Sequence, residues 1–593
     1  RLATDLYLPA TTTGPVPGVL IRTPYSKDAK HAAFLRDRDS IIRFFAGNGY
    51  AVAIQDKRGR FQSEGDYIVS VGDDLDGYDT VDWLSRQGWS NARVGAYGCS
   101  YEGDVQLFMA GQKHPALKAL IPQASGSAMG SLGQQYRYFG VRVGGAAEWA
   151  GSIGWFGSHG QKVFPRLPAG LDRAEYNAND RLWERARKPS PVDFWKAVWH
   201  LRMKDALPAR GMPATNFADN IARAPTDPYW SRLPYMTPAY TSDVPALFIN
   251  SWYDFGADIT LAEFNHLRAT SVSQTARDHQ FAIISPHSHC DFERGASEHT
   301  RIGELEVGDT RFDYRKAYLT WFDAWLKDDA SARAAIRAWP KLRYYNMGRN
   351  RWQQAGQWPI AGTVEREFLI DSTRGANSLA GDGVLREGQE EGAAANVAGS
   401  AADRFVYDPA NPVPSRGGSM CCTGSPDAVA GALDQRPVEA RSDVLVYTSE
   451  PLVQALDVTG IPRVVLHVSS DVVDTDFTAK LVDVHPDGRA FNILEGILRA
   501  RYREGQDREV WMAPGGVYEV TVPLGATSNV FLPGHRIRLE ISSSNFPRFD
   551  RNLNLGGINA EHTTWRVANN TIHHTPELRS RLLLPVVPTQ AKR

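Results

Sequence analysis

The order of apolar segments along the chain is the feature that most limits its fold. In the first third, short strand-like apolar runs alternate with segments of helical spacing. These runs are 18–25, 50–56, 93–98 and 117–123. Between the second and third, Leu75, Tyr78, Val81 and Leu84 recur every three residues, which is typical of a helix over 73–87. The alternation predicts a mostly parallel sheet that helices cover on both faces.

The strand pattern stops after this first part of the chain and later resumes. The stretch 145–240 is rich in tryptophan and has helix-like periods, which predicts a helical insertion. Strand-like runs return at 245–252 and 279–286, and a strongly amphipathic segment at 312–327 predicts a further helix. The α/β domain is therefore expected to be interrupted by helices.

Beyond about residue 340 the pattern becomes that of an all-β domain. Alternating apolar and polar runs are separated by turns rich in Gly, Pro and Asp. The runs are 365–370, 443–449, 463–469, 476–484, 517–522 and 536–542. This predicts a sandwich or jelly roll of antiparallel sheets, with 375–402 as a long loop.

Composition excludes several classes of protein. Lys+Arg number 66 and Asp+Glu 67, so a formal net charge of −1 offers no broad field for collecting nucleic acid. No apolar stretch approaches the ~18 residues that a membrane-spanning helix needs. Four cysteines in 593 residues are too few for a disulfide scaffold. We therefore expect no nucleic-acid partner and no membrane span.

The strand ends carry the residues that could do chemistry. In doubly wound sheets, functional groups collect in loops at the carboxyl ends of strands. The third run ends in Gly-Cys-Ser-Tyr-Glu-Gly at 98–103, where Ser100 lies between a strand and a helix. This is the setting of a nucleophile elbow, in which a tight turn lifts the hydroxyl out of the sheet. The usual spacing has glycine at position 102, whereas this chain has Glu102 and then Gly103.

Two further strand ends complete a possible catalytic triad. Asp254 and His289 each follow an apolar run, and Ser100, Asp254 and His289 occur in the chain order of α/β-hydrolase triads. A serine nucleophile needs a base, and the base needs a carboxylate to fix its tautomer. The alternative is a turn serine, a capping aspartate and a loop histidine.

Several motifs together resemble one family. They are RTPY at 22–25, IQDKRGRFQSEGDY at 54–67, GCSYEG at 98–103, WYD at 252–254, SPHSH at 285–289, VDTDFTAKLVDVHPDGRAFNI at 473–493 and GHRIRLEISSSNFPRFDRN at 534–552. They look like the family of cocaine esterase, α-amino-acid ester hydrolase, glutaryl-cephalosporin acylases and X-prolyl dipeptidyl aminopeptidases, and most of all its cocaine esterase branch. The resemblance covers nearly the whole chain.

The resemblance implies an architecture. It comprises an α/β-hydrolase catalytic domain at 1–144 and 241–354, a helical cap domain at 145–240 and a C-terminal jelly-roll domain at 355–593. These are the same three parts that the apolar pattern predicts.

The resemblance also implies roles for individual residues. Ser100 is expected to be the nucleophile, His289 the general base and acid, and Asp254 the orienting carboxylate. The hydroxyl of Tyr25 and the backbone N–H of Tyr101 are expected to form the oxyanion hole. His287 is expected to be a packing or supporting group.

Departures from the family pattern limit the substrate. Amino-ester hydrolases of this family bind a substrate ammonium with carboxylates just before the cap, whereas this chain has GQQYR at 133–137. An α-amino ester or dipeptidyl substrate is therefore disfavoured, although Glu148 or Glu102 could lend charge. Phe255 precedes Gly256, in the reverse of the cocaine esterase order, which reshapes the acyl pocket. The side chains expected to contact substrate are Gln55, Trp149, Trp155, Phe156 and Phe255.

The sequence thus predicts a serine hydrolase of small carboxylic esters, with an apolar or aromatic acyl group favoured. An acylase or peptidase that cuts amides is the nearest alternative, and a non-catalytic binding protein is a more distant one. Neither metal nor organic cofactor is expected. Relatives are often dimers or larger, so a homo-oligomer is an open possibility.

The cysteines give one further expectation. Cys99 precedes the nucleophile and Cys290 follows the base, and the catalytic contact brings their Cα atoms to about 6 Å, a usual disulfide span. The arrangement also resembles that of tannases and feruloyl esterases, in which such a bridge ties the triad together. We expect a Cys99–Cys290 disulfide, which would indicate a periplasmic or secreted protein; without it a cytoplasmic protein is expected. Cys421 and Cys422 are adjacent and could form only a vicinal bridge.

Overall fold

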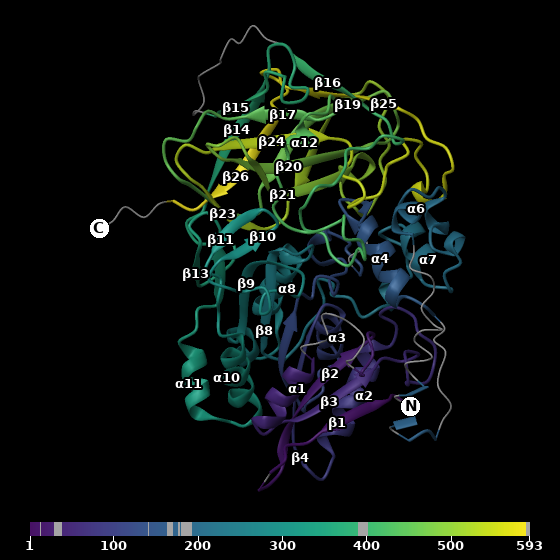
Figure 1. The fold of residues 1–593 in the computed structure, drawn as a ribbon, viewed down its shortest axis with the longest axis vertical. Helices are drawn as coiled ribbons and strands as arrows, with labels where there is room; N and C mark the ends of the chain where they lie inside the picture. The colour runs from purple at the N-terminus through teal and green to yellow at the C-terminus, as the bar shows by residue number, and fades with distance from the viewer. Residues whose placement is uncertain are drawn as a thin grey trace.

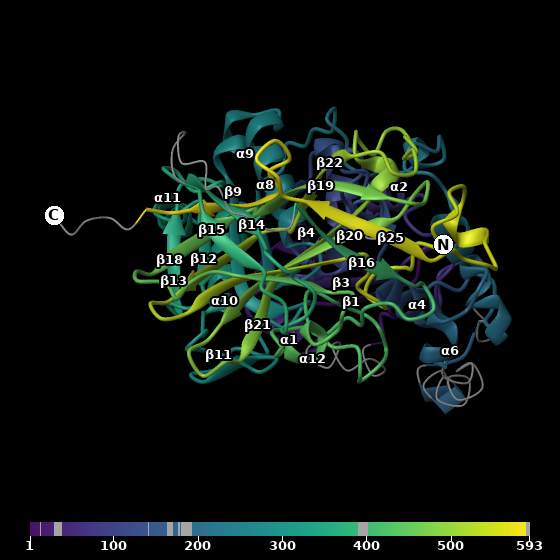
Figure 2. The ribbon, with the colours of Figure 1, turned by 90° about the horizontal axis from the view of Figure 1, so that it is seen from above.

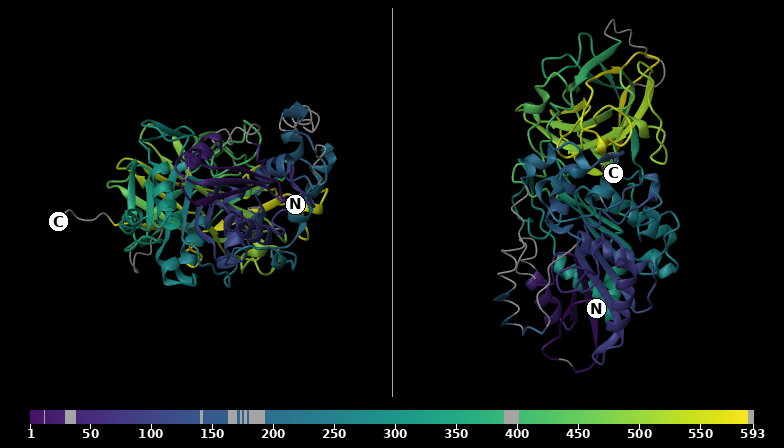
Figure 3. Two further views of the ribbon diagram at one scale, coloured as in Figure 1. Left: turned by 90° about the horizontal axis from the view of Figure 1, so that it is seen from below. Right: turned by 90° about the vertical axis from the view of Figure 1, so that its right-hand side faces the viewer.

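The molecule has three parts stacked along its long axis. The computed structural model describes residues 1–11, 13–28, 38–139, 142–162, 170–172, 174–175, 178–179, 193–388 and 401–588. Figure 1 shows an α/β part at the bottom, a group of helices at mid-height on the right and a β-rich part at the top. The side view in Figure 3 shows the same order.

A nine-stranded sheet forms the core of the α/β part. Its strands are β1 (Thr4–Tyr7), β2 (Val16–Thr23), β3 (Ala51–Asp56), β4 (Ser90–Cys99), β5 (Leu117–Gln123), β8 (Ala246–Tyr253), β9 (Gln280–Ser288), β12 (Leu342–Asn346) and β13 (Arg351–Ala355). Their order across the sheet is β1-β3-β2-β4-β5-β8-β9-β12-β13. The seven inner strands run parallel, and β1 and β13 pair antiparallel at the edges. Each of the six predicted apolar runs overlaps one of the strands β2, β3, β4, β5, β8 and β9.

Alternation along the strands fixes which helix covers which face. Val19 and Ile21 pack in the hydrophobic cluster that includes α1 (Arg38–Gly47), α10 (Tyr314–Leu326) and α11 (Ala330–Arg337). Leu20, between them, faces the opposite cluster. That cluster includes α2 (Asp73–Ser85), α3 (Tyr101–Ala110) and α8 (Ala257–Thr270). Both faces are buried, as expected for a parallel sheet. The predicted helices 73–87 and 312–327 correspond to α2 and α10.

The insertion between β5 and β8 is mostly helical where it is described, with one short antiparallel pair of strands, β6 (Arg142–Val143) and β7 (Ala146–Ala147). Its described helices are α4 (Trp149–His159), α6 (Phe194–Val198) and α7 (Phe217–Ala222), with the short 3-10 turns Leu132–Gln134, Met203–Asp205, Pro208–Arg210 and Trp230–Arg232. The predicted helical insertion also includes 163–169, 173, 176–177 and 180–192, which lie outside the described residues. The apolar side chains of this part join the same cluster that packs under α2 and α3. Figure 2 shows α6 and α11 at opposite sides of the molecule.

The last part of the chain is a jelly roll with its own core. Its strands are β14 (Val364–Asp371), β15 (Val384–Glu387), β16 (Ala402–Tyr407), β17 (Leu445–Thr448), β18 (Leu456–Gly460), β19 (Arg463–Ser470), β20 (Asp476–Val484), β21 (Ala490–Arg499), β22 (Tyr518–Pro523), β23 (Thr527–Phe531), β24 (Arg536–Ser542), β25 (Ala568–His573) and β26 (Arg581–Val586). All six predicted strands are present. The predicted loop 375–402 contains β15, and its residues 389–400 lie outside the described residues.

The jelly roll holds the first turn of α4. The backbone N–H groups of Trp149 and Ala150 donate to the carbonyls of Arg548 and Pro547, at 2.7 and 2.9 Å. The first N–H groups of a helix have no partner within the helix and need an acceptor from elsewhere. The jelly roll therefore fixes the position of a helix that belongs to the insertion.

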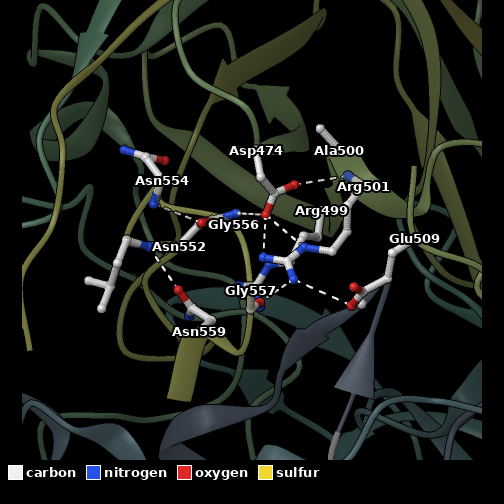
Figure 4. Close-up of polar contacts among 12 residues, drawn as sticks. Asp474, Arg499, Ala500, Arg501, Glu509, Asn552, Asn554, Gly556, Gly557 and Asn559 are labelled. Carbon is white, nitrogen blue, oxygen red and sulfur yellow. Dashed lines mark hydrogen bonds and ion pairs between the residues drawn. The ribbon is translucent and has the colours of Figure 1, made fainter. Parts of the chain in front are cut away.

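A buried polar network holds the jelly-roll loops next to this junction (Figure 4). Both carboxylate oxygens of Asp474 accept from Arg501, one from its backbone N–H and one from Nε, each at 2.9 Å. Asn552 donates to the same carboxylate at 2.8 Å, and Asn559 accepts from the N–H of Leu553 at 2.9 Å. The side chains of Asp474 and Arg501 are 0% and 4% exposed, so Asp474 is the buried counter-charge of Arg501, whose second partner Glu509 is partly exposed.

None of the helices in the described ranges is both long and apolar enough to cross a membrane.

We predict that Asp474→Asn lowers the free energy of unfolding by about 3 kcal/mol, because it removes the buried counter-charge of Arg501 and leaves only the partly exposed carboxylate of Glu509, at 3.4 Å. Asp487→Asn is the matched control, since Asp487 pairs with Arg489 where both side chains are about half exposed. Chemical denaturation of the two variants measures the difference. Equal stability of the two would show that the buried pair does not hold the loops.

Candidate active site

The turn after β4 has the geometry of a nucleophile elbow. Ser100 has φ 65° and ψ −132°, a backbone conformation that residues other than glycine rarely adopt. It lies directly between Cys99, the last residue of β4, and Tyr101, the first residue of α3. Its N–H donates to the Gln123 carbonyl at 2.9 Å, so the neighbouring strand holds the turn.

Two glycines make this turn possible. A Cβ on Gly98 would lie 2.5 Å from the Cβ of Glu102, and one on Gly103 would lie 2.6 Å from the backbone oxygen of Gln123. The second contact explains why glycine occurs at position 103 in this chain. The helix packs on β5 through that residue, so the glycine is needed at the contact with the strand.

The expected base and its carboxylate are in contact. Nδ1 of His289 lies 2.6 Å from Oδ2 of Asp254, and the N–H of Gly256 donates to Oδ1 at 2.8 Å. Asp254 is 3% exposed, which strengthens its hold on the ring. Nε2 of His289 is buried and has no hydrogen-bond partner in the described part of the chain, which leaves it available for a reacting group.

A tryptophan sets the direction of the Tyr25 hydroxyl. The indole N–H of Trp155 lies 3.2 Å from the Tyr25 oxygen, and Oγ of Ser100 lies 3.2 Å from the same oxygen. Indole only donates, so the phenol oxygen accepts from Trp155 and its own proton can point toward Ser100. Burial raises the pKa of Tyr25 to about 12, so the hydroxyl keeps its proton at neutral pH.

The side chain of Tyr101 anchors the start of α3. Its hydroxyl lies 2.7 Å from both Oδ2 of Asp73 and the N–H of Ser70, and it also contacts the ammonium of Lys57. Burial lowers the pKa of Lys57 to about 8. No sequence motif identified Lys57 or Asp73 as part of the site, because both act through the Tyr101 hydroxyl and not on Ser100 itself. Together they fix the helix turn whose N–H follows the nucleophile.

Two cavities meet at Ser100 and Tyr25. The inner one, of about 50 Å³, has aromatic walls and contains two carboxyl groups. Its residues include Asp104, Phe139, Glu148, Ser152, Trp155, Phe156 and Phe255. The outer one, of about 560 Å³, contains His289 and a jelly-roll loop. Its residues include Ser158, His159, Met420, Cys421, Cys422 and Val429. Ser100 therefore lies where an aromatic chamber meets a wider one that contains His289.

The structure brings only some of the predicted contact residues to these cavities. Trp155, Phe156 and Phe255 line the inner one. Gln55 does not line either cavity in the described part of the chain, because its amide oxygen accepts from Arg22 and Thr80 under the sheet. Trp149 does not line them either: it is 0% exposed and donates to the carbonyl of Val198. Gln55 and Trp149 thus lie outside both cavities, and their contact with substrate stays a prediction.

The jelly-roll loop at Cys421 and Cys422 closes the site against α4. A Cβ on Gly154 would lie 2.0 Å from the carbonyl oxygen of Cys422, and one on Gly151 would lie 3.1 Å from that of Cys421. These two glycines let the loop approach the helix closely. The sequence did not reveal this wall, because its partners are far apart in the chain.

All four cysteines are paired. Cys99 and Cys290 form a disulfide with a Cα–Cα distance of 6.0 Å, as the sequence predicts. It joins the residue before Ser100 to the residue after His289. Cys421 and Cys422 form the vicinal bridge that the sequence left open.

Comparison with known proteins agrees with this geometry. Residues 1–291 match the model of the X-Pro dipeptidyl-peptidase (S15 family), and residues 335–583 match that of the X-Pro dipeptidyl-peptidase C-terminal non-catalytic domain. Cocaine esterase of Rhodococcus sp. (strain MB1 Bresler) is 34% identical over 592 residues, 99% of this chain and 96% of the relative. The chain belongs to the family of cocaine esterase and the S15 peptidases. It is a serine hydrolase that cleaves carboxylic esters.

Solved structures of the same architecture support the assignment. An aminopeptidase from the marine sediment archaeon Thaumarchaeota archaeon superposes with a TM-score of 0.79 at 26% identity, covering 99% of this chain and 94% of that one. An α-amino acid ester hydrolase superposes with a TM-score of 0.74 at 23% identity, covering the same shares. The α/β-hydrolase domain with a C-terminal β-rich domain is thus the architecture of this cocaine esterase relative.

Two histidines compete for the catalytic role in the sequence, and the structure separates them. His287 is 1% exposed, and its Nε2 lies 3.1 Å from Oγ1 of Thr310, away from Asp254. Burial lowers the pKa of His287 to about 4. This histidine is therefore a neutral buried group at physiological pH, and His289 is the one beside the carboxylate.

We predict that His287 makes the fold sensitive to acid. Its pKa is lower in the folded than in the unfolded chain. Its contribution to the free energy of unfolding is therefore complete above the ordinary pKa of about 6.5. That contribution is lost as the pH falls toward 4, where the unfolded chain binds a proton that the folded chain excludes. The loss amounts to about 3 kcal/mol.

The measurement compares urea unfolding at pH 7 and pH 4.5. In His287→Gln the difference in unfolding free energy between the two pH values should be smaller than in the wild type. His299→Gln, at a side chain that is 85% exposed, should keep the wild-type difference. An unchanged difference in His287→Gln would contradict the prediction.

Proposed function

We propose that Ser100 is the nucleophile of this esterase, with His289 as general base and acid and Asp254 as its orienting carboxylate. Ser100 attacks the ester carbonyl while Nε2 of His289 takes its proton, and His289 then protonates the leaving alcohol. Water hydrolyses the acyl-enzyme by the same route. The observation that carries the assignment is the Tyr25 hydroxyl, which accepts from Trp155 and lies 3.2 Å from Oγ of Ser100.

The two cavities suggest which part of the ester binds where. The leaving oxygen must lie near His289 to receive its proton, and His289 lines the outer cavity. The acyl group then extends into the inner cavity, among Phe139, Trp155, Phe156 and Phe255. We therefore propose an ester whose acyl part is apolar or aromatic and whose alcohol part is the larger one.

The charges of the inner cavity favour a neutral acyl group. Burial raises the pKa of Asp104 well above its usual range and that of Glu148 to about 7, and Glu148 lies 3.4 Å from the guanidinium of Arg548. Arg137, in the stretch where the amino-ester hydrolases carry acids, pairs with Asp258 at 3.0 Å. A substrate ammonium would therefore meet carboxyls that are partly protonated or already paired.

We also propose a separate function for each of the three parts of the chain. Residues 1–144 and 241–354 supply the catalytic groups, 145–240 supply the acyl chamber as a cap, and 355–593 close the site as a jelly roll. The basis is that α4 provides Trp155 and Phe156, whereas the loop with Cys421 and Cys422 provides the opposite wall.

We predict that Tyr25→Phe lowers kcat by about 10²-fold with little change in KM, because the hydroxyl bond is worth most when the carbonyl oxygen becomes an anion. Steady-state kinetics on one ester measures both constants. Covalent labelling by an organophosphonate, with Ser100→Ala as the unlabelled control, tests the nucleophile independently. A raised KM at unchanged kcat would show that Tyr25 binds only the ground state.

We predict that the acyl chamber decides substrate choice. The panel consists of p-nitrophenyl esters of increasing chain length, benzoyl and feruloyl esters, and the matching amides. Phe156→Ala should change the ranking of acyl groups, because Phe156 lines the inner cavity. Trp149→Phe, at an equally buried residue outside both cavities, should keep the ranking. A strong preference for the amides would show that an acylase or peptidase activity is the main one. An unchanged ranking of acyl groups in Phe156→Ala would contradict the proposal that the acyl group binds in the inner cavity.

A further inference from the structure

Three ligand groups of the kind that bind soft metal ions lie together at the active site. One ring nitrogen of His289 and the sulfur atoms of Cys421 and Cys422 are all within 4.8 Å of one another. Such spacing is close to the separation of ligands around a tetrahedral zinc ion. The two sulfurs come from the jelly roll and the nitrogen comes from the catalytic domain.

His289 is already oriented as metal-binding histidines are. Its Nδ1 is held by Asp254 at 2.6 Å, and Nε2 is buried without a hydrogen-bond partner in the described ranges. Histidine ligands of zinc commonly donate their second N–H to a carboxylate, which fixes the ring and raises its basicity. The same contact that orients a general base therefore prepares a ligand.

The vicinal disulfide prevents these three groups from binding a metal ion. Two sulfurs bonded to each other carry no charge and are poor ligands, whereas thiolates are strong ligands for zinc. A dithiol reductant delivers two electrons and two protons, breaks the S–S bond, gives two thiols and is itself oxidised to a disulfide. A divalent metal ion then displaces the thiol protons as it binds.

Exposure determines which disulfide a reductant meets first. Of the four cysteines Cys422 alone is exposed, whereas Cys421, Cys99 and Cys290 are each partly buried. The outer cavity of about 560 Å³, which admits a small reductant, is lined by both cysteines of the vicinal pair but by only Cys290 of the other bridge. Mild reduction should therefore open the vicinal pair before the bridge that joins Cys99 and Cys290.

We propose that Cys421, Cys422 and His289 form a redox-gated site for a soft divalent metal ion such as Zn²⁺. In the oxidised protein the two sulfurs form part of the cavity wall, and in the reduced protein they bind the metal together with Nε2 of His289. The metal then occupies the nitrogen that must take the proton of Ser100. Loss of activity on metal binding rests on the proposed role of His289, whereas the binding itself does not.

The test uses the full chain, treated with a mild dithiol, freed of reductant and titrated with Co²⁺ and then Zn²⁺. Alkylation and mass spectrometry first establish that Cys421 and Cys422 are reduced. We expect the sulfur-to-cobalt charge-transfer absorption, retention of about one zinc ion per chain and loss of nearly all esterase activity. The oxidised protein should show none of these effects.

The matched control is Cys421→Ser/Cys422→Ser, treated identically and compared with its own metal-free rate. It should lack the cobalt absorption and keep its rate with zinc, even if Cys99–Cys290 is reduced. Cys422→Ser alone tests the same point if the double variant does not fold. His289→Gln should weaken cobalt binding while both sulfurs remain, a readout that is independent of activity.

The outcomes distinguish the proposed metal site from the proposed catalytic role of His289. Cobalt absorption without loss of activity supports the metal site and contradicts the proposed role of His289 as base. Reduced wild type without the absorption, or with an absorption that the double serine variant shares, overturns the site. Equal zinc inhibition of the wild type and the double variant also overturns it.

Discussion

The site depends on one constraint: the carboxyl ends of the parallel strands all lie at the same end of the sheet. Four of these strands are β2, β4, β8 and β9. The residues just beyond their carboxyl ends are Tyr25, Ser100, Asp254 and His289, respectively. Parallel strands buried on both faces leave their carboxyl ends as the natural place for polar side chains. The disulfide between Cys99 and Cys290 ties the ends of β4 and β9 across two intervening strands.

α4 connects this end of the sheet to the other two parts of the molecule. Its first N–H groups donate to carbonyls of the jelly roll, its glycines allow the loop of Cys421 and Cys422 to approach, and Trp155 orients the hydroxyl of Tyr25. The helix thus links the position of the jelly roll to the hydroxyl of Tyr25, the group proposed to bind the oxyanion. A domain that carries none of the proposed catalytic residues in this way supports the geometry of the proposed site.

Burial gives similar groups different roles around the nucleophile. Asp254 is held by a backbone N–H and the ring of His289, whereas Asp104 has its pKa raised by burial. His287, two residues before the proposed base, is kept neutral because it lies in the core beside Thr310. The position of each group within the folded molecule, more than its residue type, decides whether it exchanges protons.

The sequence determined the features that depend on local patterns: the alternation of strands and helices, the β-rich last part, and the elbow signalled by Gly98, Ser100 and Gly103. The order of Ser100, Asp254 and His289 and the likeness to a known family predicted the triad and the bridge between Cys99 and Cys290. Only the tertiary structure decided that Gln55 and Trp149 lie outside the cavities, that Trp155 orients Tyr25, and that Cys421 and Cys422 approach His289. The reason is that periodicity shows which face of an element is buried, but the partner it meets is set by packing between segments hundreds of residues apart.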